Sequence, residues 1–111
     1  MLSIIVALSL ATQSPVNHIA EGDAAGPMHP DVQLHHYQAA LAVDSTSYEA
    51  NWKAARAIGD VAKQIQGNAD SLKRRRDSLY AVGRVYAERA IRADSTKPDG
   101  HYVLAMILGR L

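Results

Sequence analysis

The residues best suited to chemistry in this chain are four consecutive cations, Lys73-Arg74-Arg75-Arg76. Arg84 adds positive charge to the same segment, and Tyr86 is an aromatic side chain that could contact a partner. Clusters of Lys and Arg bind anionic groups such as acidic peptides or lipid head groups. The candidate partner-binding residues are therefore Lys73, Arg74, Arg75, Arg76, Arg84 and Tyr86.

The basic run also has a simpler interpretation, as the solvated surface of a helix. Four consecutive helical residues point to all sides of the helix, so they cannot form one narrow contact stripe. A cluster of cations near a helix start is mildly unfavourable with the helix dipole, however, and this favours a functional reason for it. A nucleic-acid partner is not expected, because no aromatic residue interleaves the basic run.

Metal binding and catalysis find no support in the sequence. Five His residues are present, but none forms the His-x-x-x-His or Glu-x-x-His spacing that places two ligands on one helix face. The chain has no P-loop, no Gly-x-Gly-x-x-Gly and no Gly-x-Ser-x-Gly motif. We therefore expect a protein that is not an enzyme and that has no catalytic residues, no metal and no cofactor.

Composition favours an all-α fold. The chain lacks Phe and Cys and is rich in Ala, and small side chains let helices pack closely against one another. The lack of Cys excludes a disulfide framework and a thiolate zinc site. Charge is unevenly distributed, since all twelve Lys and Arg residues lie at or after Lys53. A basic second half could be either a binding face or a solvated helical surface.

Apolar residues recur at helical spacing from residue 31 onward, and they define the predicted folded domain, 31–111. Four helices are predicted, at about 31–43, 47–66, 70–94 and 98–111. Thr46-Ser47-Tyr48-Glu49 is typical of a capping box, in which Glu49 would accept a hydrogen bond from the Thr46 backbone N–H. Small residues such as Ala54, Ala55, Gly83 and Ala90 should allow close helix contacts, with Trp52, Tyr86 and Tyr102 filling the gaps.

The N-terminal residues are typical of an export signal followed by a linker. Residues 2–11 form an apolar run that is too short to span a bilayer, which needs about 20 residues. Small residues near Ala11 predict a signal peptide over 1–11, although no cation precedes the run. Residues 12–30 are rich in Pro and Gly and are predicted to be a flexible linker. We expect an exported protein, periplasmic or secreted, with a cytoplasmic protein as the alternative.

Two segments of the chain are similar at an offset of fifty residues. Residues 40–55 and 90–105 share the turn sequence Asp-Ser-Thr, at Asp44-Ser45-Thr46 and Asp94-Ser95-Thr96. Trp52 in the first segment corresponds to Tyr102 in the second. A period of about 20–50 residues is typical of repeat proteins, in which neighbouring units stack on one another.

The duplicated segment Ala-Leu-x-x-Asp-Ser-x-x-x-Glu-Ala-x-Trp-x-x-Ala resembles the junction between two tetratricopeptide repeats. The later residues, with His101-Tyr102-Val103-Leu104-Ala105, are similar to regulator-of-microtubule-dynamics-type proteins and their bacterial relatives. Ser replaces the usual Pro after Asp44 and Asp94, and the period is longer than usual. The resemblance implies a solenoid of antiparallel helix pairs, of about four helices after a flexible N-terminal segment.

The implied function is a non-catalytic scaffold that binds a protein or peptide. The alternative is an adaptor that docks on an anionic surface through the basic helix 73–92. No transmembrane span is expected. The strongly apolar segment 98–111 lacks a partner, so we expect either self-association through it or a chain that is a fragment of a longer protein.

Overall fold

The computed structural model describes residues 14–111, and this part of the chain is all-helical, as predicted. Four of its five helices match the predicted ones to within about three residues at each end. The predicted signal peptide over 1–11 lies outside the described residues. The helices are α2 (Pro15–Ala25), α3 (Pro30–Val43), α4 (Tyr48–Gln64), α5 (Asp70–Ala93) and α6 (Pro98–Leu108).

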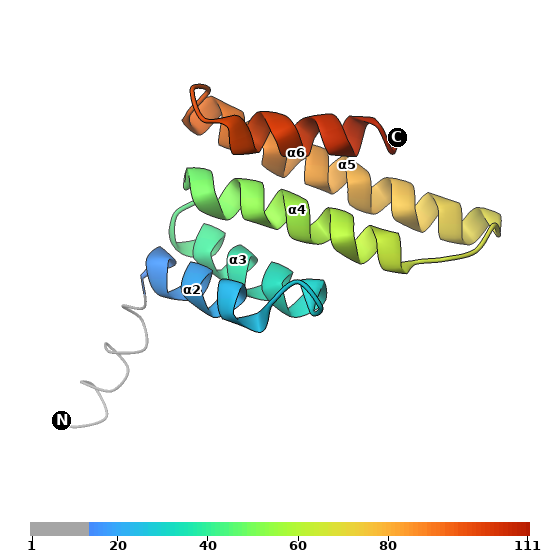
Figure 1. The fold of residues 1–111 in the computed structure, drawn as a ribbon, viewed down its shortest axis with the longest axis horizontal. Coiled ribbons are helices and arrows are strands. Elements are labelled where there is room, and N and C mark those ends of the chain that lie inside the picture. Colours follow the sequence, from blue (N-terminus) through green and yellow to red (C-terminus); the bar gives the residue numbers. More distant parts are fainter. Residues whose placement is uncertain (1–13) are drawn as a thin grey trace.

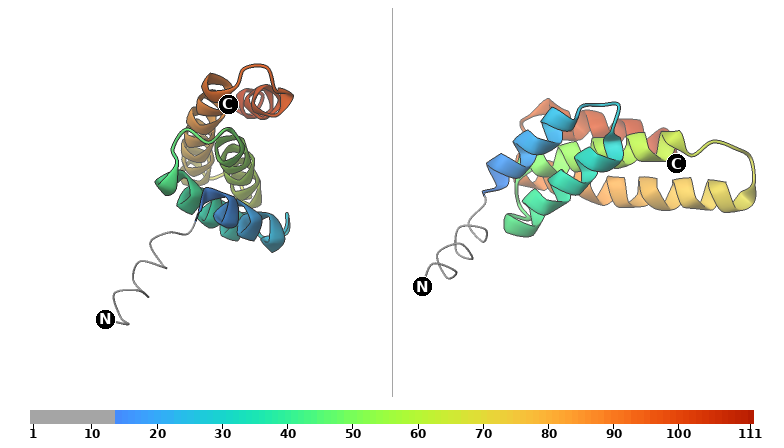
Figure 2. Two further views of the ribbon diagram at one scale, coloured as in Figure 1. Left: turned by 90° about the vertical axis from the view of Figure 1, so that its left-hand side faces the viewer. Right: turned by 90° about the horizontal axis from the view of Figure 1, so that it is seen from below.

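Helix α4 is the centre of the arrangement. Consecutive helices lie side by side and run in opposite directions, with α2 and α3 on one side of α4 and α5 and α6 on the other (Figure 1). The end-on view in Figure 2 shows the same order. Of the described helices, only α4 contacts each of the other four.

Small residues of α4 make these contacts close. Ala54 and Ala57 are fully buried in a cluster with α2 and α3, whereas Ala55 is fully buried in a cluster with α5 and α6. A Cβ atom added to Gly83 of α5 would lie 2.9 Å from the side chains of Ile58 and Ile107. The predicted close approach through Ala and Gly is therefore confirmed, and it leaves no space for a methyl group at Gly83.

The predicted flexible linker is wrong for residues 15–25, which form α2. Pro15 is in the first turn of the helix, where backbone N–H groups have no acceptor within the helix, so the lack of an N–H costs no hydrogen bond. The Ser14 hydroxyl caps the helix by accepting a hydrogen bond from the Asn17 N–H. Gly22 is buried because the ring of Tyr37 lies directly against it. Pro and Gly, which usually indicate a linker, here begin a helix and permit a close contact.

The start of α4 differs from the predicted capping box. Ser47 is the N-cap, and its hydroxyl accepts a hydrogen bond from the Ala50 N–H at 3.1 Å. The Thr46 N–H donates to the Asp44 carboxylate at 3.0 Å, so it is not available to Glu49. Glu49 instead forms an ion pair with Lys53. A nearby aspartate upstream therefore replaces the glutamate as the acceptor for this amide.

The two similar turns have the same hydrogen bonds. Asp44 accepts from the Thr46 hydroxyl at 2.8 Å as well as from its N–H, and Asp94 accepts from the hydroxyl and N–H of Thr96 at 2.5 and 3.0 Å. The hydrogen bonds from Thr96 lower the pKa of Asp94 below its usual value. The Asp-Ser-Thr sequence thus specifies one local turn, used once before α4 and once before α6.

A second correspondence was not predicted. The buried Asn51 side chain donates to the Ser45 carbonyl at 3.1 Å, and the His101 ring lies 2.8 Å from the Ser95 carbonyl. These residues also occur fifty positions apart. Two different side chains therefore bind the same carbonyl position of the turn, a similarity that residue identity alone does not show.

Replacement of Gly22 by Ala tests the packing of α2. The new methyl group would lie 2.5 Å from the Tyr37 ring, which is fully buried and cannot move away easily. We expect Gly22→Ala to lower the free energy of unfolding by about 1–3 kcal/mol in urea titrations, as overpacking does.

Gly59→Ala is the matched control. Its methyl group meets no atom within 4 Å, so it should raise the free energy of unfolding by about 0.5–1 kcal/mol through helix propensity. If both variants were equally stabilised, α2 would not pack on Tyr37 as described.

Candidate partner-binding groove

Two pockets flank α4 and share the side chains of Trp52, Arg56 and Asp60. One, of about 540 Å³, extends toward α2, and the other, of about 390 Å³, extends toward α6. Because both include the same strip of α4, we treat them together as the α4 groove. Its residues are Asp23, Pro27, Gln33, Glu49, Trp52, Lys53, Arg56, Asp60, Asp99, Tyr102, Val103 and Met106.

Trp52 and Arg56 form the centre of the groove. The Arg56 guanidinium carbon lies 5.1 Å from the centroid of the Trp52 ring, within the range of a cation–π contact. Trp52 is half-buried, since one side of it packs on the core shared by α4, α5 and α6. Tryptophan and arginine in such partly enclosed positions are the residues that most often dominate protein interfaces.

On the α2 side, a polar network fixes the wall of the groove. The buried Tyr37 hydroxyl donates to Oδ1 of Asp23 at 2.6 Å, and the Lys53 ammonium contacts Oδ2 of Asp23 at 2.7 Å. Lys53 also contacts Glu49 at 3.2 Å, and its side chain is only 12% exposed. The network joins α2, α3 and α4 through a single carboxylate, Asp23.

The network shifts two pKa values in opposite directions. Burial raises the pKa of Tyr37 above its usual value, and the hydrogen bond to the Asp23 carboxylate raises it further. Partial burial alone would raise the pKa of Asp23, but hydrogen bonds from Lys53 and Tyr37 outweigh it, and the pKa is lowered. At neutral pH, Asp23 is therefore the anion and Tyr37 the neutral donor.

On the other side, α6 presents an aromatic side chain to the groove. The Tyr48 hydroxyl accepts a hydrogen bond from the Gly100 N–H at 3.0 Å, which holds the start of α6 against α4. Tyr102 is 68% exposed, so the prediction that it fills a gap between helix pairs is wrong. Val103, the next residue, is buried instead, and Tyr102 is left available to a ligand.

The groove has an excess of acidic side chains. It contains four carboxylates and two cations, and one of these cations, Lys53, is neutralised within the polar network. The carboxylates are Asp23, Glu49, Asp60 and Asp99. An aromatic centre with acidic flanks is complementary to a segment that carries both basic and apolar side chains.

The residues predicted from the basic run lie in several places rather than one. Lys73 and Arg76 line a separate pocket between α4, α5 and the C-terminal residues, whereas Arg84 pairs with Glu88 at 2.7 Å. The Tyr86 hydroxyl accepts a hydrogen bond from Gln38 of α3. Arg74 and Arg75 are exposed and do not line this pocket.

Sequence reasoning did not identify the α4 groove. The apolar spacing of its helix predicts that Trp52 fills a gap between helix pairs, whereas in the structure one side of it packs on the core and the rest lines the groove. The usable signal was that Trp52 is the only tryptophan in the chain and has cations at the next position and four positions later.

Substitution of Asp23 tests the polar network. Its lowered pKa means that the network stabilises the fold fully above about pH 3.8, the unperturbed value, and loses this effect as the pH falls through the lower folded pKa. Asp23→Asn should lower the free energy of unfolding at pH 7 by about 1 kcal/mol, since Asp23 is partly exposed and solvent screens the pair.

The difference between Asp23→Asn and the wild-type chain should shrink in urea titrations below pH 3.8. Asp77→Asn is the control, because Asp77 is exposed and makes no ion pair within residues 14–111. An Asp23→Asn difference that stayed constant down to pH 2 would contradict the role of this carboxylate.

Within residues 14–111, no group of three or more His, Cys, Asp or Glu side chains is placed to hold a metal ion. None of the helices in this part of the chain is both long and apolar enough to cross a membrane. Comparisons with protein-family models, with curated proteins and with solved structures found no match.

Proposed function

We propose that this chain is a non-catalytic protein-interaction module of tetratricopeptide type, and that the α4 groove binds a segment of a partner protein. The observation that carries the proposal is the half-buried strip of Trp52, Arg56 and Asp60, which lines a pocket on each side of α4. Large apolar and cation-bearing side chains that remain accessible on a monomer commonly mark an interaction surface.

The order of the helices supports a stack of helix pairs. Helix α4 contacts both α2 and α6, and α3 and α5 each lie between two of these three helices in the sequence. In a curved stack of helix pairs, the first helices of successive pairs line the concave side, where ligands bind. Apart from Pro27 and Gln33, the groove residues belong to α2, α4 and α6, the helices that would line the concave side of such a stack.

The chemistry of the groove specifies a class of ligand. A basic side chain of the partner would be attracted to Asp60 and Asp99, and an apolar side chain would cover Trp52 and Tyr102. The ligand is therefore a protein segment with Lys or Arg beside apolar residues. The proposal needs no proton transfer and no nucleophile, so it places no residue in a catalytic role.

Selection of peptides tests the proposal. A displayed peptide library is selected on the wild-type chain, and the selected peptides are then titrated while the fluorescence of Trp52, the only tryptophan, is recorded. We expect basic and apolar residues to be enriched. Trp52→Ala should weaken binding by about 30-fold, the usual loss at an interface hot spot, measured by calorimetry.

Because Trp52 also packs on the core, Asp60→Asn provides a second variant, which removes one carboxylate of the groove together with its ion pair to Lys63. It should weaken the binding of basic peptides, more so at low salt. Val85→Ala removes an exposed apolar side chain that does not line the groove, and it should leave binding unchanged. Equal binding by Trp52→Ala, Asp60→Asn and the wild-type chain would rule out the groove.

A further inference from the structure

Another pocket, at the C-terminal end of α4, is lined mostly by positively charged side chains. It shares no residue with the α4 groove. It has a volume of about 410 Å³ and is formed by the end of α4, the first half of α5 and the residue that follows α6 and Gly109. Four of its six lining residues are cations. These are Lys63, Lys73, Arg76 and Arg110, and the other two are Asp77 and Tyr80.

The protein neutralises this charge only in part. Lys63 contacts Asp60 at 3.4 Å, but Lys73 and Arg110 form no ion pair with any carboxylate of the described residues. Asp77 lines the same pocket and yet is not within ion-pair distance of any of the four cations. Like charges gathered at one place repel one another, so the arrangement is most stable with an anion between them.

Two of the side chains are held in place before any ligand arrives. The Arg76 guanidinium donates to the Ile65 carbonyl at 2.8 Å, which fixes it across the α4–α5 connection and leaves its other N–H groups unused by this bond. Tyr80 is only 5% exposed, because the surrounding helices bury it. A preorganised site loses little side-chain entropy when a ligand binds.

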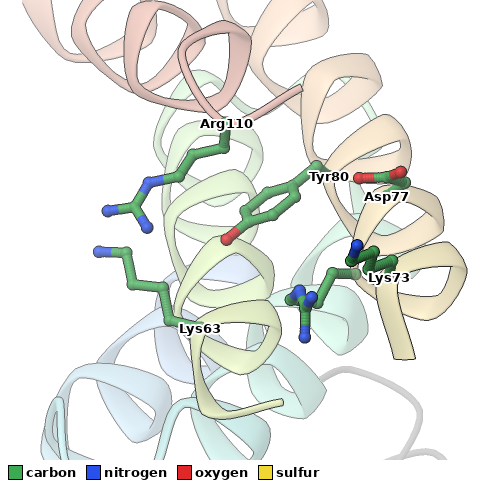
Figure 3. A pocket seen from close by; sticks show the side chains of 6 residues that line it. Lys63, Lys73, Asp77, Tyr80 and Arg110 are labelled. Carbon is green, nitrogen blue, oxygen red and sulfur yellow. The ribbon is translucent and has the colours of Figure 1, made fainter. Parts of the chain in front are cut away.

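The Tyr80 hydroxyl adds a neutral donor to the cations. Figure 3 shows it pointing toward the ends of the Lys63 and Arg110 side chains, with Lys73 on the other side of the ring in this view. The hydroxyl makes no hydrogen bond to another described residue, so it can donate to a ligand. Tyr80 itself is buried and lines the pocket.

We propose that this pocket binds a phosphate group, either free or as part of a larger molecule. A phosphate carries up to two negative charges and several acceptor oxygens, and it accepts paired hydrogen bonds from guanidinium groups. A single carboxylate has one charge and two oxygens, which are too few for four cations. The pocket volume also leaves room for part of the molecule to which the phosphate is attached.

Calorimetric titration of the full chain with pyrophosphate and with inorganic phosphate tests the proposal. The pocket variant is the double substitution Lys73→Gln and Arg110→Gln, which removes two of the three pocket cations that form no ion pair with a described carboxylate and keeps Arg76. It should weaken pyrophosphate binding about tenfold or more, as expected for lost charge-assisted hydrogen bonds. Tyr80→Phe keeps the net charge and the buried ring, and it should also weaken binding.

The matched control is the double substitution Arg74→Gln and Arg75→Gln. It removes the same amount of charge from exposed residues between Lys73 and Arg76 that do not line the pocket. It should change the affinity for pyrophosphate by less than about twofold, since exposed charges are screened by salt. The proposal is overturned if the two double variants lose affinity equally, or if the wild-type chain binds neither anion.

A second arm identifies the source of the phosphate. Vesicles of phosphatidylglycerol are compared with vesicles of phosphatidylcholine in a sedimentation assay, with and without pyrophosphate as competitor. Binding to phosphatidylglycerol that pyrophosphate and the pocket variant both abolish supports a lipid head group. Pyrophosphate binding without vesicle binding supports a soluble phosphate compound. If the wild-type chain does not bind pyrophosphate and the pocket variant still binds vesicles, the proposed phosphate site is overturned.

Discussion

The close approach of helices to the alanine-rich helix α4 is the constraint on which the rest of the structure depends. Ala54 and Ala57 allow α2 and α3 to pack on one side, and Ala55 allows α5 and α6 to pack on the other. A small chain without Phe has few large side chains with which to fill a core. It therefore obtains its packing density by bringing helix backbones together, which gives dispersion contacts without bulky residues.

The same constraint creates the candidate groove. Because two strips of α4 are occupied by packing, the remaining strip, with Trp52, Arg56 and Asp60, faces outward between α2 and α6. The hydrogen bonds of Asp23 hold α2 at one edge, and Tyr48 holds the start of α6 at the other. The groove is thus lined by side chains whose supporting helices are fixed, a condition for specific binding.

The sequence predicted four of the five described helices, because apolar spacing along amphipathic segments is a local signal. It failed for α2, where Gly22 is needed for contact with Tyr37, a residue distant in the sequence. The sequence also did not show which residues of the basic run lie on the same side of α5. Lys73 and Arg76 meet Arg110 in one pocket while their neighbours do not, and only the packing of α4, α5 and α6 determines this.

Amide hydrogen exchange of α4 tests the central claim most directly. If α4 is the close-packed centre, the amides of Ala54, Ala57 and Ile58 should exchange only through global unfolding. Their opening free energy should then equal the free energy of unfolding from urea titration and exceed that of the α2 amides around Ile19. Exchange in α4 as fast as in α2 would contradict an arrangement organised around α4.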